Sequence, residues 1–399
     1  MADNKDKKVL NVPALRFPEF NGEWITRPIK DIADFIGGGT PSSANEAYWQ
    51  GTIPWVSSSD IVEDNINDIT ISRYITEEAI SNSATKLCSA PVILIVSRVG
   101  VGKVALSSKA ICTSQDFCNL INIKVHPTFL AYSLSQIMKR KSIEVQGTSI
   151  KGITSLEIQK IILHIPSLQE QHKISDLFQL IDKRIAVQSK IIEDLRLLRD
   201  AIMVEHYRKC NKSELCIYDI GEPFNVMNLS KDDLTKDGSP CIIYGELFTT
   251  YGCVIENVVS HTTKSLNSTL SIKGDLLFPA STTVDALSLI APSSINEDGI
   301  ILGGDMFGIH VNEQYNSNYL SYYFNIIGKK NLAKYAKGST IIHLHYADIQ
   351  KAKITLPNNN EQEAVANLLL KVEHKLNIEQ KMLINYLNIK NFLLRQMFI

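Results

Sequence analysis

The chain has 399 residues, of which 44% are hydrophobic and 21% charged, a composition that excludes an intrinsically disordered protein and suits two or three folded domains. With 41 basic and 42 acidic residues the net charge is −1, which excludes a protein that binds nucleic acid through overall positive charge. Any nucleic-acid surface must therefore be local.

The first ten residues, MADNKDKKVL, lack the apolar segment of a signal peptide, and no run of 18 apolar residues follows them. The seven cysteines include no C-x-x-C pair, the spacing typical of zinc knuckles and redox motifs. These features predict a cytoplasmic protein with reduced thiols, no metal site and no membrane contact.

After an N-terminal extension (1–20), residues 21–166 form the first predicted domain. Short β-branched runs such as PVILIVSRV (91–99) and NLINIKV (119–125) predict strands, and Gly, Asn and Pro turns separate them. A helix is expected in 126–145. The domain is therefore predicted to be mixed α/β (α+β).

The segment SRVGVGKVAL (97–106) contains GVGK, which resembles part of a phosphate-binding loop. The full motif needs a glycine where this chain has Ser97 and a hydroxyl residue where it has Val104. A nucleotide site at this loop is therefore not predicted.

A long helix is predicted over 167–209, because no Gly or Pro interrupts residues 168–208. Its apolar residues recur at spacings of 3 and 4 in a narrow stripe, which is typical of a coiled coil. The stripe comprises Ile174, Leu177, Ile181, Ile185, Ile192, Leu195 and Ile202.

Residues 210–357 form a second predicted mixed domain, with strands at GDLLFPAS (274–281) and GIHVN (308–312) and a helix in 316–336. A second long helix is predicted over 358–399. Its stripe comprises Val365, Leu368, Val372, Leu376, Leu383, Tyr386 and Leu393.

The two halves of the chain repeat one unit at a constant offset of 191 residues. The segment 147–171 aligns without a gap to 338–362, and Pro166 and Gln171 recur as Pro357 and Gln362. Since neither stripe has another long partner, the two helices are expected to pack together as an antiparallel coiled coil. The alternative is that each helix lies along its own domain.

Several segments resemble the specificity subunit of a type I restriction-modification enzyme, and the resemblance covers essentially the whole chain. They are IADFIGGGTPSS (32–43), AYWQGTIPWVSSSDI (47–61), ILIVSRVGVGKVAL (93–106), the junction from GTSIKGIT to IPSLQEQHKI, and the duplicated helices ending in LLRQMF. The second copy departs from the pattern, with GEPFNVMNLSKDDL (221–234) and FPASTTVDAL (278–287) at the corresponding places.

The resemblance implies two target recognition domains, each recognising one half of a split double-stranded DNA sequence, with the long helices as a spacer. It also implies partners: two methyltransferase subunits bound by the helices, and restriction subunits that join the complex. This chain would then have no catalytic centre and no cofactor, and the methyltransferase would use S-adenosylmethionine.

Candidate DNA contacts come from loops that offer hydroxyl groups, cations and flexible glycines, since such groups bind phosphates and base edges. In the hairpin suggested by the resemblance, Gly100 and Gly102 would allow a tight bend. The candidates are Thr40, Ser42, Ser57, Ser58, Ser59, Arg98, Lys103, Thr148, Ser149, Lys151, Lys337, Ser339, Thr340 and His343.

Structural alternatives apply to these candidates. The serine-rich segments could be ordinary turns, and the recurring segments around Lys151 and Lys337 could be junctions with the helices. His343 and His345 alternate as two metal ligands might, but no third ligand is near in sequence, and no metal is predicted.

Two other classes of function compete with DNA recognition. An adenine methyltransferase would need N/D-P-P-[YFW] and a common nuclease would need P-D before [DE]-x-K, but the chain contains no N-P-P, D-P-P or P-D. A coiled-coil scaffold with two protein-binding domains predicts the same helices and stays open.

Overall fold

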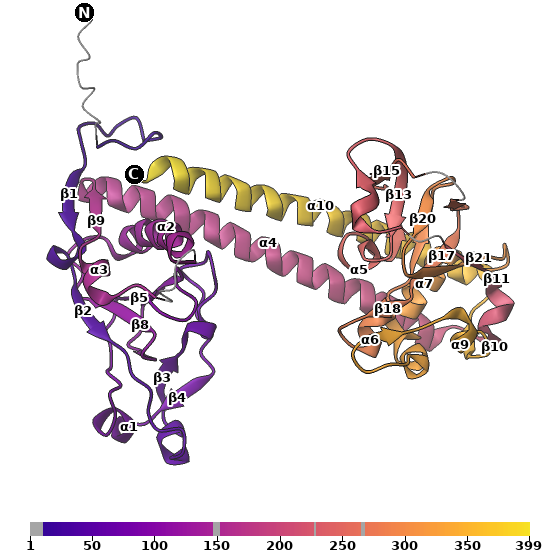
Figure 1. The fold of residues 1–399 in the computed structure, drawn as a ribbon, viewed down its shortest axis with the longest axis horizontal. Coiled ribbons are helices and arrows are strands. Elements are labelled where there is room, and N and C mark those ends of the chain that lie inside the picture. Colours follow the sequence, from indigo (N-terminus) through magenta and orange to yellow (C-terminus); the bar gives the residue numbers. More distant parts are fainter. Residues whose placement is uncertain (1–10, 147–151, 227–228, 265–267) are drawn as a thin grey trace, which may run out of the picture. The chain divides into compact units, whose positions relative to one another are not determined.

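The structure is a computed structural model that describes residues 11–146, 152–226, 229–264 and 268–399 (Figure 1). It divides into two compact units, unit 1 (Met1–Gln188 with Met382–Ile399) and unit 2 (Ser189–Lys381). The predicted class is confirmed: two tandem mixed α/β domains are each followed by a long helix, α4 (Leu168–Lys209) or α10 (Asn359–Met397). The division into units falls within both helices, so the predicted domain boundaries stay a prediction.

Unit 1 contains an antiparallel four-stranded sheet in the order β2-β8-β5-β6 and a three-stranded sheet in the order β4-β3-β7. All five residues of β5 are buried, because helix α2 (Pro127–Gln146) covers one face of the larger sheet and a second apolar cluster covers the other. The other elements are α1 (Glu77–Ser81), α3 (Ser155–Gln159), β2 (Asp34–Gly37), β3 (Ile53–Val56), β4 (Arg73–Ile75), β5 (Val92–Val96), β6 (Val104–Ser107), β7 (Cys112–Thr113) and β8 (Phe117–Ile121).

Unit 2 contains two five-stranded sheets, in the orders β11-β21-β17-β19-β14 and β12-β15-β13-β20-β16. The first comprises β11 (Gly221–Asn225), β14 (Val254–Ile255), β17 (Asp275–Pro279), β19 (Ser293–Ile295) and β21 (Met306–Val311). The second comprises β12 (Leu234–Thr235), β13 (Ser239–Ile243), β15 (Ser260–Thr262), β16 (Thr269–Leu270) and β20 (Ile301–Gly303). The remaining elements are the pair β18 (Ser281–Thr282) and β22 (Ile342–His343), with α5 (Glu246–Thr249), α6 (Ala286–Leu289), α7 (Ser317–Ile326), α8 (Lys329–Leu332) and α9 (Tyr346–Ile349).

Each domain is closed by a pair of antiparallel strands at the point where the chain enters and leaves it. In unit 1, β1 (Ile25–Pro28) pairs with β9 (Ile162–Ile165). In unit 2, β10 (Ser213–Cys216) pairs with β23 (Lys353–Leu356). The long helix begins a few residues after β9 or β23, so strand pairing fixes where each helix leaves its domain.

The recurring glutamine of the repeat holds this junction together. Gln171 donates from Nε2 to the Pro166 carbonyl at 2.9 Å and accepts from the His126 backbone N–H at 2.8 Å. Gln362 makes the same contacts, with Pro357 at 2.8 Å and Asn316 at 3.0 Å. Both side chains are buried. The structural-junction alternative therefore explains this part of the repeat.

The N-terminal segment packs against both helices of unit 1. The Leu15 backbone N–H donates to the Gln396 carbonyl at 2.9 Å. The Arg16 guanidinium binds both carboxylate oxygens of Glu170, which is fully buried, at 2.7 Å each. This segment therefore anchors the start of α4 and the end of α10 to the same domain.

Helices α4 and α10 pack in opposite directions, as predicted. Within unit 1, Asp182 of α4 pairs with Lys390 of α10, and Arg184 contacts Tyr386. The residue number therefore falls along α10 as it rises along α4, which defines an antiparallel pair.

The two predicted apolar stripes divide between the domain cores and the helix pair. At the ends, Ile174, Leu177, Ile181 and Leu393 join the core of unit 1, and Ile202 and Val365 join the core of unit 2. Between them lie Ile185, Ile192, Leu195, Val372, Leu376, Leu383 and Tyr386, all buried or half-buried. Leu368 departs from the expected stripe, because it is 47% exposed while the next residue, Leu369, is fully buried.

Among the described residues, no helix is long and apolar enough to span a membrane.

Candidate nucleic-acid interface

The GVGK segment is the turn of a β-hairpin. Strands β5 and β6 pair in antiparallel fashion, and residues 97–103 connect them. Gly100 and Gly102 have φ angles of 82° and 109°, which side-chain-bearing residues rarely adopt. The bend thus depends on these two glycines, as the sequence predicted.

The hairpin contacts the serine-rich segment 57–60 through Lys103. Its Nζ donates to the Ser58 carbonyl at 3.3 Å. Asp60 accepts from the Ser57 backbone N–H at 2.7 Å and forms an ion pair with Arg73, which also donates to the Ser57 hydroxyl at 2.6 Å. The Ser59 hydroxyl in turn lies 2.9 Å from that of Ser57. Internal contacts therefore occupy Ser57 and Asp60, which fits the ordinary-turn alternative for this segment.

The GGGTPSS loop (37–43) approaches other backbone closely. A Cβ at Gly38 would lie 2.1 Å from the Ser114 carbonyl oxygen, so no larger residue fits there. The Thr40 hydroxyl donates to the Gln115 side chain at 2.5 Å. Ser42 is exposed, and its carbonyl accepts from the Trp49 indole at 3.2 Å. Of these two candidates, Thr40 is held in place by its hydrogen bond to Gln115, whereas Ser42 is exposed to solvent.

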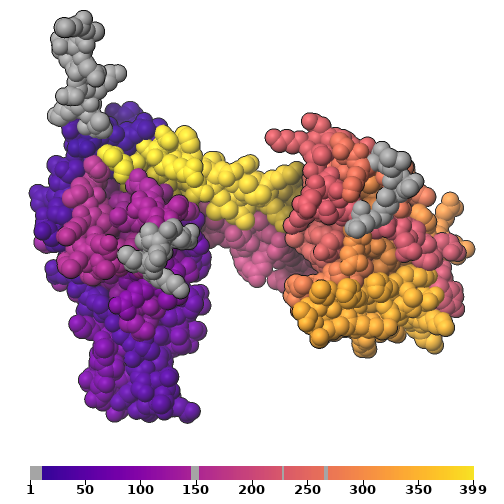
Figure 2. Space-filling view, in the orientation of Figure 1, coloured from indigo at the N-terminus to yellow at the C-terminus, as the bar shows by residue number. Residues whose placement is uncertain are grey.

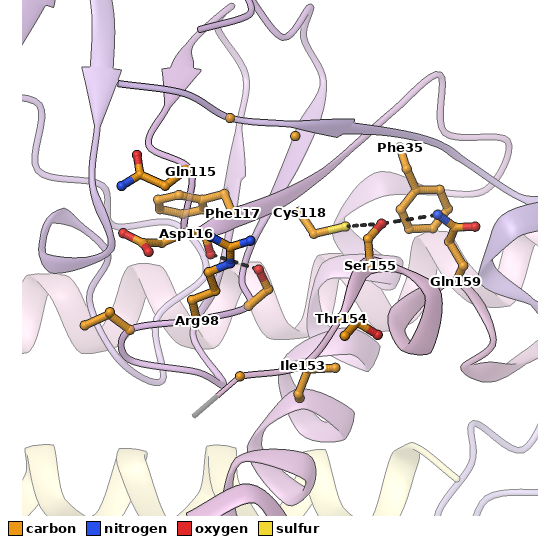
Figure 3. A pocket seen from close by; sticks show the side chains of 15 residues that line it. Phe35, Arg98, Gln115, Asp116, Phe117, Cys118, Ile153, Thr154, Ser155 and Gln159 are labelled. Atoms are coloured by element: carbon orange, nitrogen blue, oxygen red, sulfur yellow. Dashed lines mark hydrogen bonds between the residues drawn. The ribbon is translucent and has the colours of Figure 1, made fainter. Parts of the chain in front are cut away.

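These loops surround a cavity of about 820 Å³ in unit 1 (Figure 3). Arg98 lies at its edge, exposed and without a hydrogen bond or ion pair to any described residue. Polar side chains share the lining with aromatic ones, a mixture suited to hydrogen-bond recognition of a flat ligand. The labelled lining residues are Phe35, Arg98, Gln115, Asp116, Phe117, Cys118, Ile153, Thr154, Ser155 and Gln159.

Residues 152–155 line one side of the cavity. The Ile153 backbone N–H donates to the Ser97 carbonyl at 2.8 Å. A Cβ at Gly152 would lie 3.0 Å from the same oxygen and 3.6 Å from Arg98. Residues 152–153 therefore pack directly beside Arg98. The neighbouring candidates Thr148, Ser149 and Lys151 lie outside the described residues.

Unit 2 repeats this arrangement with different side chains. The Leu344 N–H donates to the Ala280 carbonyl at 2.9 Å, as the Ile153 N–H donates to that of Ser97. Leu344 lies 191 residues after Ile153, and Ala280 directly follows β17 as Ser97 directly follows β5. The next pair in the register is Ser281 with His343. Ser281 and His343 thus occupy the places of Arg98 and Gly152. Arg98 is exposed, whereas Ser281 is buried and His343 half-buried, so the two domains present different side chains at this place.

The candidates in unit 2 lie on a small hairpin. Lys337 and His343 exchange backbone hydrogen bonds of 2.9 and 2.7 Å, which leaves Ser339 and Thr340 exposed at the tip. Gly338, at φ 115°, allows the turn, since a Cβ there would lie 2.0 Å from the Ile341 carbonyl oxygen. The Lys337 ammonium is 2.5 Å from Asp348.

His343 ends this hairpin, and His345 lies two residues after it. The rings of His343 and His345 are stacked, with centroids 6.1 Å apart. Over the described part of the chain, no group of three or more His, Cys, Asp or Glu residues could hold a metal ion.

Sequence analysis missed Gln115, Asp116 and Gln159 as cavity residues. Gln115 and Asp116 follow β7, 17 and 18 residues after Arg98, with strand β6 between them, and only the fold brings them together. Gln159 carried one usable signal, because it recurs in the repeat as Gln350.

Comparison with known proteins identifies a duplicated family match. The model of the type I restriction modification DNA specificity domain matches residues 21–197 and again residues 214–388. The two matches cover both mixed domains and most of both long helices.

Three relatives are themselves type I specificity subunits. The MjaIX specificity subunit of Methanocaldococcus jannaschii is 31% identical over 44% of this chain and 42% of its own length. The EcoR124I/EcoR124II specificity subunit of Escherichia coli is 30% identical over 45% of each chain. These alignments therefore span less than half of either relative. The putative MjaX specificity subunit of M. jannaschii is 23% identical over 91% of this chain and 90% of its own.

Solved structures share the fold. The S subunit of a type I restriction-modification system from M. genitalium superposes with a TM-score of 0.63 at 16% identity, covering 97% of this chain and 99% of that one. A chain from a structure on complex assembly of the type I R-M system gives a TM-score of 0.53 at 13% identity, covering 93% and 96%.

Proposed function

Since the chain belongs to the type I restriction-modification DNA specificity family, we propose that it recognises a double-stranded DNA target in two parts, one with each domain. The observation that carries this proposal is the equivalent position described above, where unit 1 has Arg98 beside Gly152 and unit 2 has Ser281 beside His343. One scaffold that presents Arg98 in one domain and His343 in the other suits the recognition of two different half-sites.

The proposed DNA surface of unit 1 is the edge of the cavity at Arg98, with Ser42 and the hairpin nearby. In unit 2 it is the hairpin with Ser339, Thr340 and His343. Hydroxyl groups and cations at such loops contact phosphates and fix orientation, while side chains that enter a groove distinguish bases. The near-neutral net charge is compatible with this role if the cations that contact DNA are local.

We also propose that the long helices bind two copies of one partner, the methyltransferase subunit. Large apolar side chains remain exposed on both helices, and the outer surface of α10 is visible in yellow in Figure 2. Two of these positions recur at the offset of 191: Val187 as Ile378, and Leu198 as Ile389. Unit 1 therefore presents Val187 and Ile389, and unit 2 presents Ile378 and Leu198. Two equivalent apolar surfaces suit two identical partners.

The chain itself is proposed to be non-catalytic and to need no cofactor. Methylation would be carried out by the partner with S-adenosylmethionine, and cleavage by restriction subunits that join the complex. The proposed location is the cytoplasm, because DNA is the proposed target.

The test is to co-express the chain with its methyltransferase subunit in a host free of other such systems, and to sequence the modified bases of the host DNA. The expected result is a split motif, two short defined halves around an undefined spacer of fixed length. The methyltransferase subunit expressed alone is the control and should leave the DNA unmodified. A complex that co-purifies without modifying DNA would favour the protein scaffold instead.

A further inference from the structure

Two ion pairs link α4 to α10, and the repeat relates them to each other. In unit 1, Asp182 Oδ1 of α4 lies 2.7 Å from Lys390 Nζ of α10. In unit 2, Glu373 Oε2 of α10 lies 3.3 Å from Arg199 Nη1 of α4. Adding 191 to 182 gives 373, and adding 191 to 199 gives 390. The acid and the base of the first pair therefore correspond to the acid and the base of the second.

Both pairs are shielded from solvent, unlike the ion pairs on the outer face of α4. The side chains of Asp182 and Lys390 are 9% and 7% exposed, and those of Glu373 and Arg199 are 10% and 20% exposed. In contrast, Lys190 pairs with Glu193 and Asp194 on the outer face of the same helix, and all three are at least 60% exposed. A shielded charge is costly when it lacks its partner, whereas an exposed one is not.

The pair in unit 1 is also bonded to the adjoining domain. Asp182 Oδ2 accepts from the Tyr132 hydroxyl at 2.6 Å and from Asn67 Nδ2 at 2.8 Å. Lys390 Nζ donates in addition to the Asp64 carbonyl at 3.0 Å. The ion pair therefore fixes the helices to each other and to residues of the same unit.

One register of the helices satisfies both pairs, because 17 residues separate Asp182 from Arg199 on α4 and Glu373 from Lys390 on α10. A coiled coil can slip by a heptad while its apolar positions still meet. A slip of seven residues would place Asp182 opposite Leu383 or Met397, and Arg199 opposite Ala366 or Gln380. Either slip would leave both shielded charges of α4 without their partners on α10, and Arg199 would keep only its ion pair with the half-exposed Asp200.

We propose that Asp182–Lys390 and Arg199–Glu373 are positioning pairs that fix the register of α4 against α10, and that this register sets the length of the spacer between the two DNA half-sites. The second clause rests on the proposed function, and the first does not. Shielded polar groups in coiled coils have this role in other proteins, where they select one register at some expense of stability.

The register is measured by the distance between nitroxide labels on cysteines placed at Leu180 and Phe392, which are exposed positions of α4 and α10 in unit 1. The half-buried Cys210 and Cys216 are replaced by serine, and the other five cysteines are buried. The unmodified helix pair should give one narrow distance distribution. A neutral variant, Asp182→Asn with Lys390→Met, Arg199→Met and Glu373→Gln, should add a population in which one helix has moved along the other by roughly 10 Å, the rise of one heptad.

Matched variants separate register from stability. Lys190→Met removes the exposed ion pairs of Lys190 with Glu193 and Asp194 and should leave the single distance unchanged. Arg199→Glu places a second carboxylate against Glu373 and should broaden the distance distribution between the labels. Adding Glu373→Arg reverses the pair and should restore the single narrow distance. These two variants also provide the test if the neutral variant does not fold. One unchanged narrow distribution in the neutral or the Arg199→Glu variant would overturn the proposal.

The spacer is then measured by sequencing the modified bases after co-expression with the methyltransferase. The neutral variant should yield motifs with more than one spacer length and unchanged half-sites. If the helix register of the neutral variant shifts while the spacer length of its motif stays the same, the ion pairs do not set the spacer length. If even the unsubstituted chain directs no modification, the proposed function fails, while the distance measurement still decides the register.

Discussion

At the residue scale, Arg98 differs from several other candidates of unit 1 in its bonding: its cationic side chain has no hydrogen bond or ion pair to a described residue. Lys103 contacts the Ser58 carbonyl, Thr40 contacts Gln115, and Ser57 contacts Arg73. Arg98 has no such bond to a described residue, and its guanidinium can donate two parallel hydrogen bonds to O6 and N7 of guanine. It is therefore the side chain of unit 1 best suited to a base-specific contact.

Arg98→Ala is expected to relax one base position in one half of the modified motif and to leave the other half unchanged. A bidentate arginine contact contributes about 1–3 kcal/mol of discrimination, or roughly 5- to 150-fold between the right and the wrong base pair. The measurement is the modification rate on DNA libraries randomised at single positions. Arg98→Lys keeps the charge but loses the paired geometry, so it should retain affinity and lose discrimination.

Arg73→Ala is the matched contrast, because Arg73 lies against Asp60, Ser57 and the Trp55 ring rather than facing the cavity. It should lower the thermal stability without relaxing any single base position. If Arg98→Ala weakened binding to every sequence equally, Arg98 would be a phosphate contact instead.

Sequence patterns identified the candidate loops but could not show which hydroxyls are already used. Thr40 and Gln115 are 75 residues apart, and Ser57, just after β3, is 16 residues from Arg73 of β4. Such pairings depend on the fold, which composition and local spacing do not contain. For the same reason Asp116, which shares the cavity with Arg98, carried no signal in the sequence.

At the element scale, the repeat marks the junction where each domain meets its helix. Helices α4 and α10 run without a break over 168–209 and 359–397, since no Gly or Pro interrupts the helical pattern there. The departure at Leu368 arises where α10 is still packed on its own domain. There Ala366 and Leu369 face the core of unit 2. The predicted stripe assumed that α10 contacts only α4, so it did not include these core-facing positions.

Gln362→Ala is expected to destabilise the protein, because it leaves the buried Pro357 carbonyl and the Asn316 N–H without their partner. Each unpaired buried group costs about 1–3 kcal/mol. Thermal unfolding monitored by circular dichroism should show a clearly lower Tm. Gln350→Ala is the control: its side chain donates at 3.4 Å to Ala347 in an exposed turn, and its loss should change the Tm little. Equal effects of the two substitutions would argue against the junction role.

At the scale of the whole molecule, duplication produces two domains that share a framework and differ where they would meet DNA. The offset of 191 predicted the tandem arrangement, because residues that build the junction, such as Gln171 and Gln362, are retained in both copies. The division of the molecule into units could not be predicted in this way. The division falls after Gln188 in α4 and after Lys381 in α10, within uninterrupted helices. Its position depends on which domain each half of a helix contacts, and the helical pattern of the sequence does not contain this information.

The strand pair β1 and β9 makes the first domain exchangeable as a block. Ile25 lies directly opposite Ile165, so the chain enters and leaves the domain through neighbouring strands, which lie about 5 Å apart. The replacement for residues 21–165 is taken from another family member that keeps this strand pair, the contact to Gln171 and groups that bond to the Asp182–Lys390 pair as Asn67, Tyr132 and Asp64 do. It should therefore fold on the same helices.

Such a replacement is expected to change one half of the modified motif and to leave the other half and the spacer length as they were. The half that persists would belong to unit 2, whose hairpin at Lys337–His343 is not altered. The measurement is again sequencing of modified bases after co-expression, with the reciprocal replacement of residues 210–357 as the control. If both halves changed together, each domain would not recognise its half-site independently, and the equivalence of Arg98 and Ser281 would reflect common ancestry without a separate role in recognition.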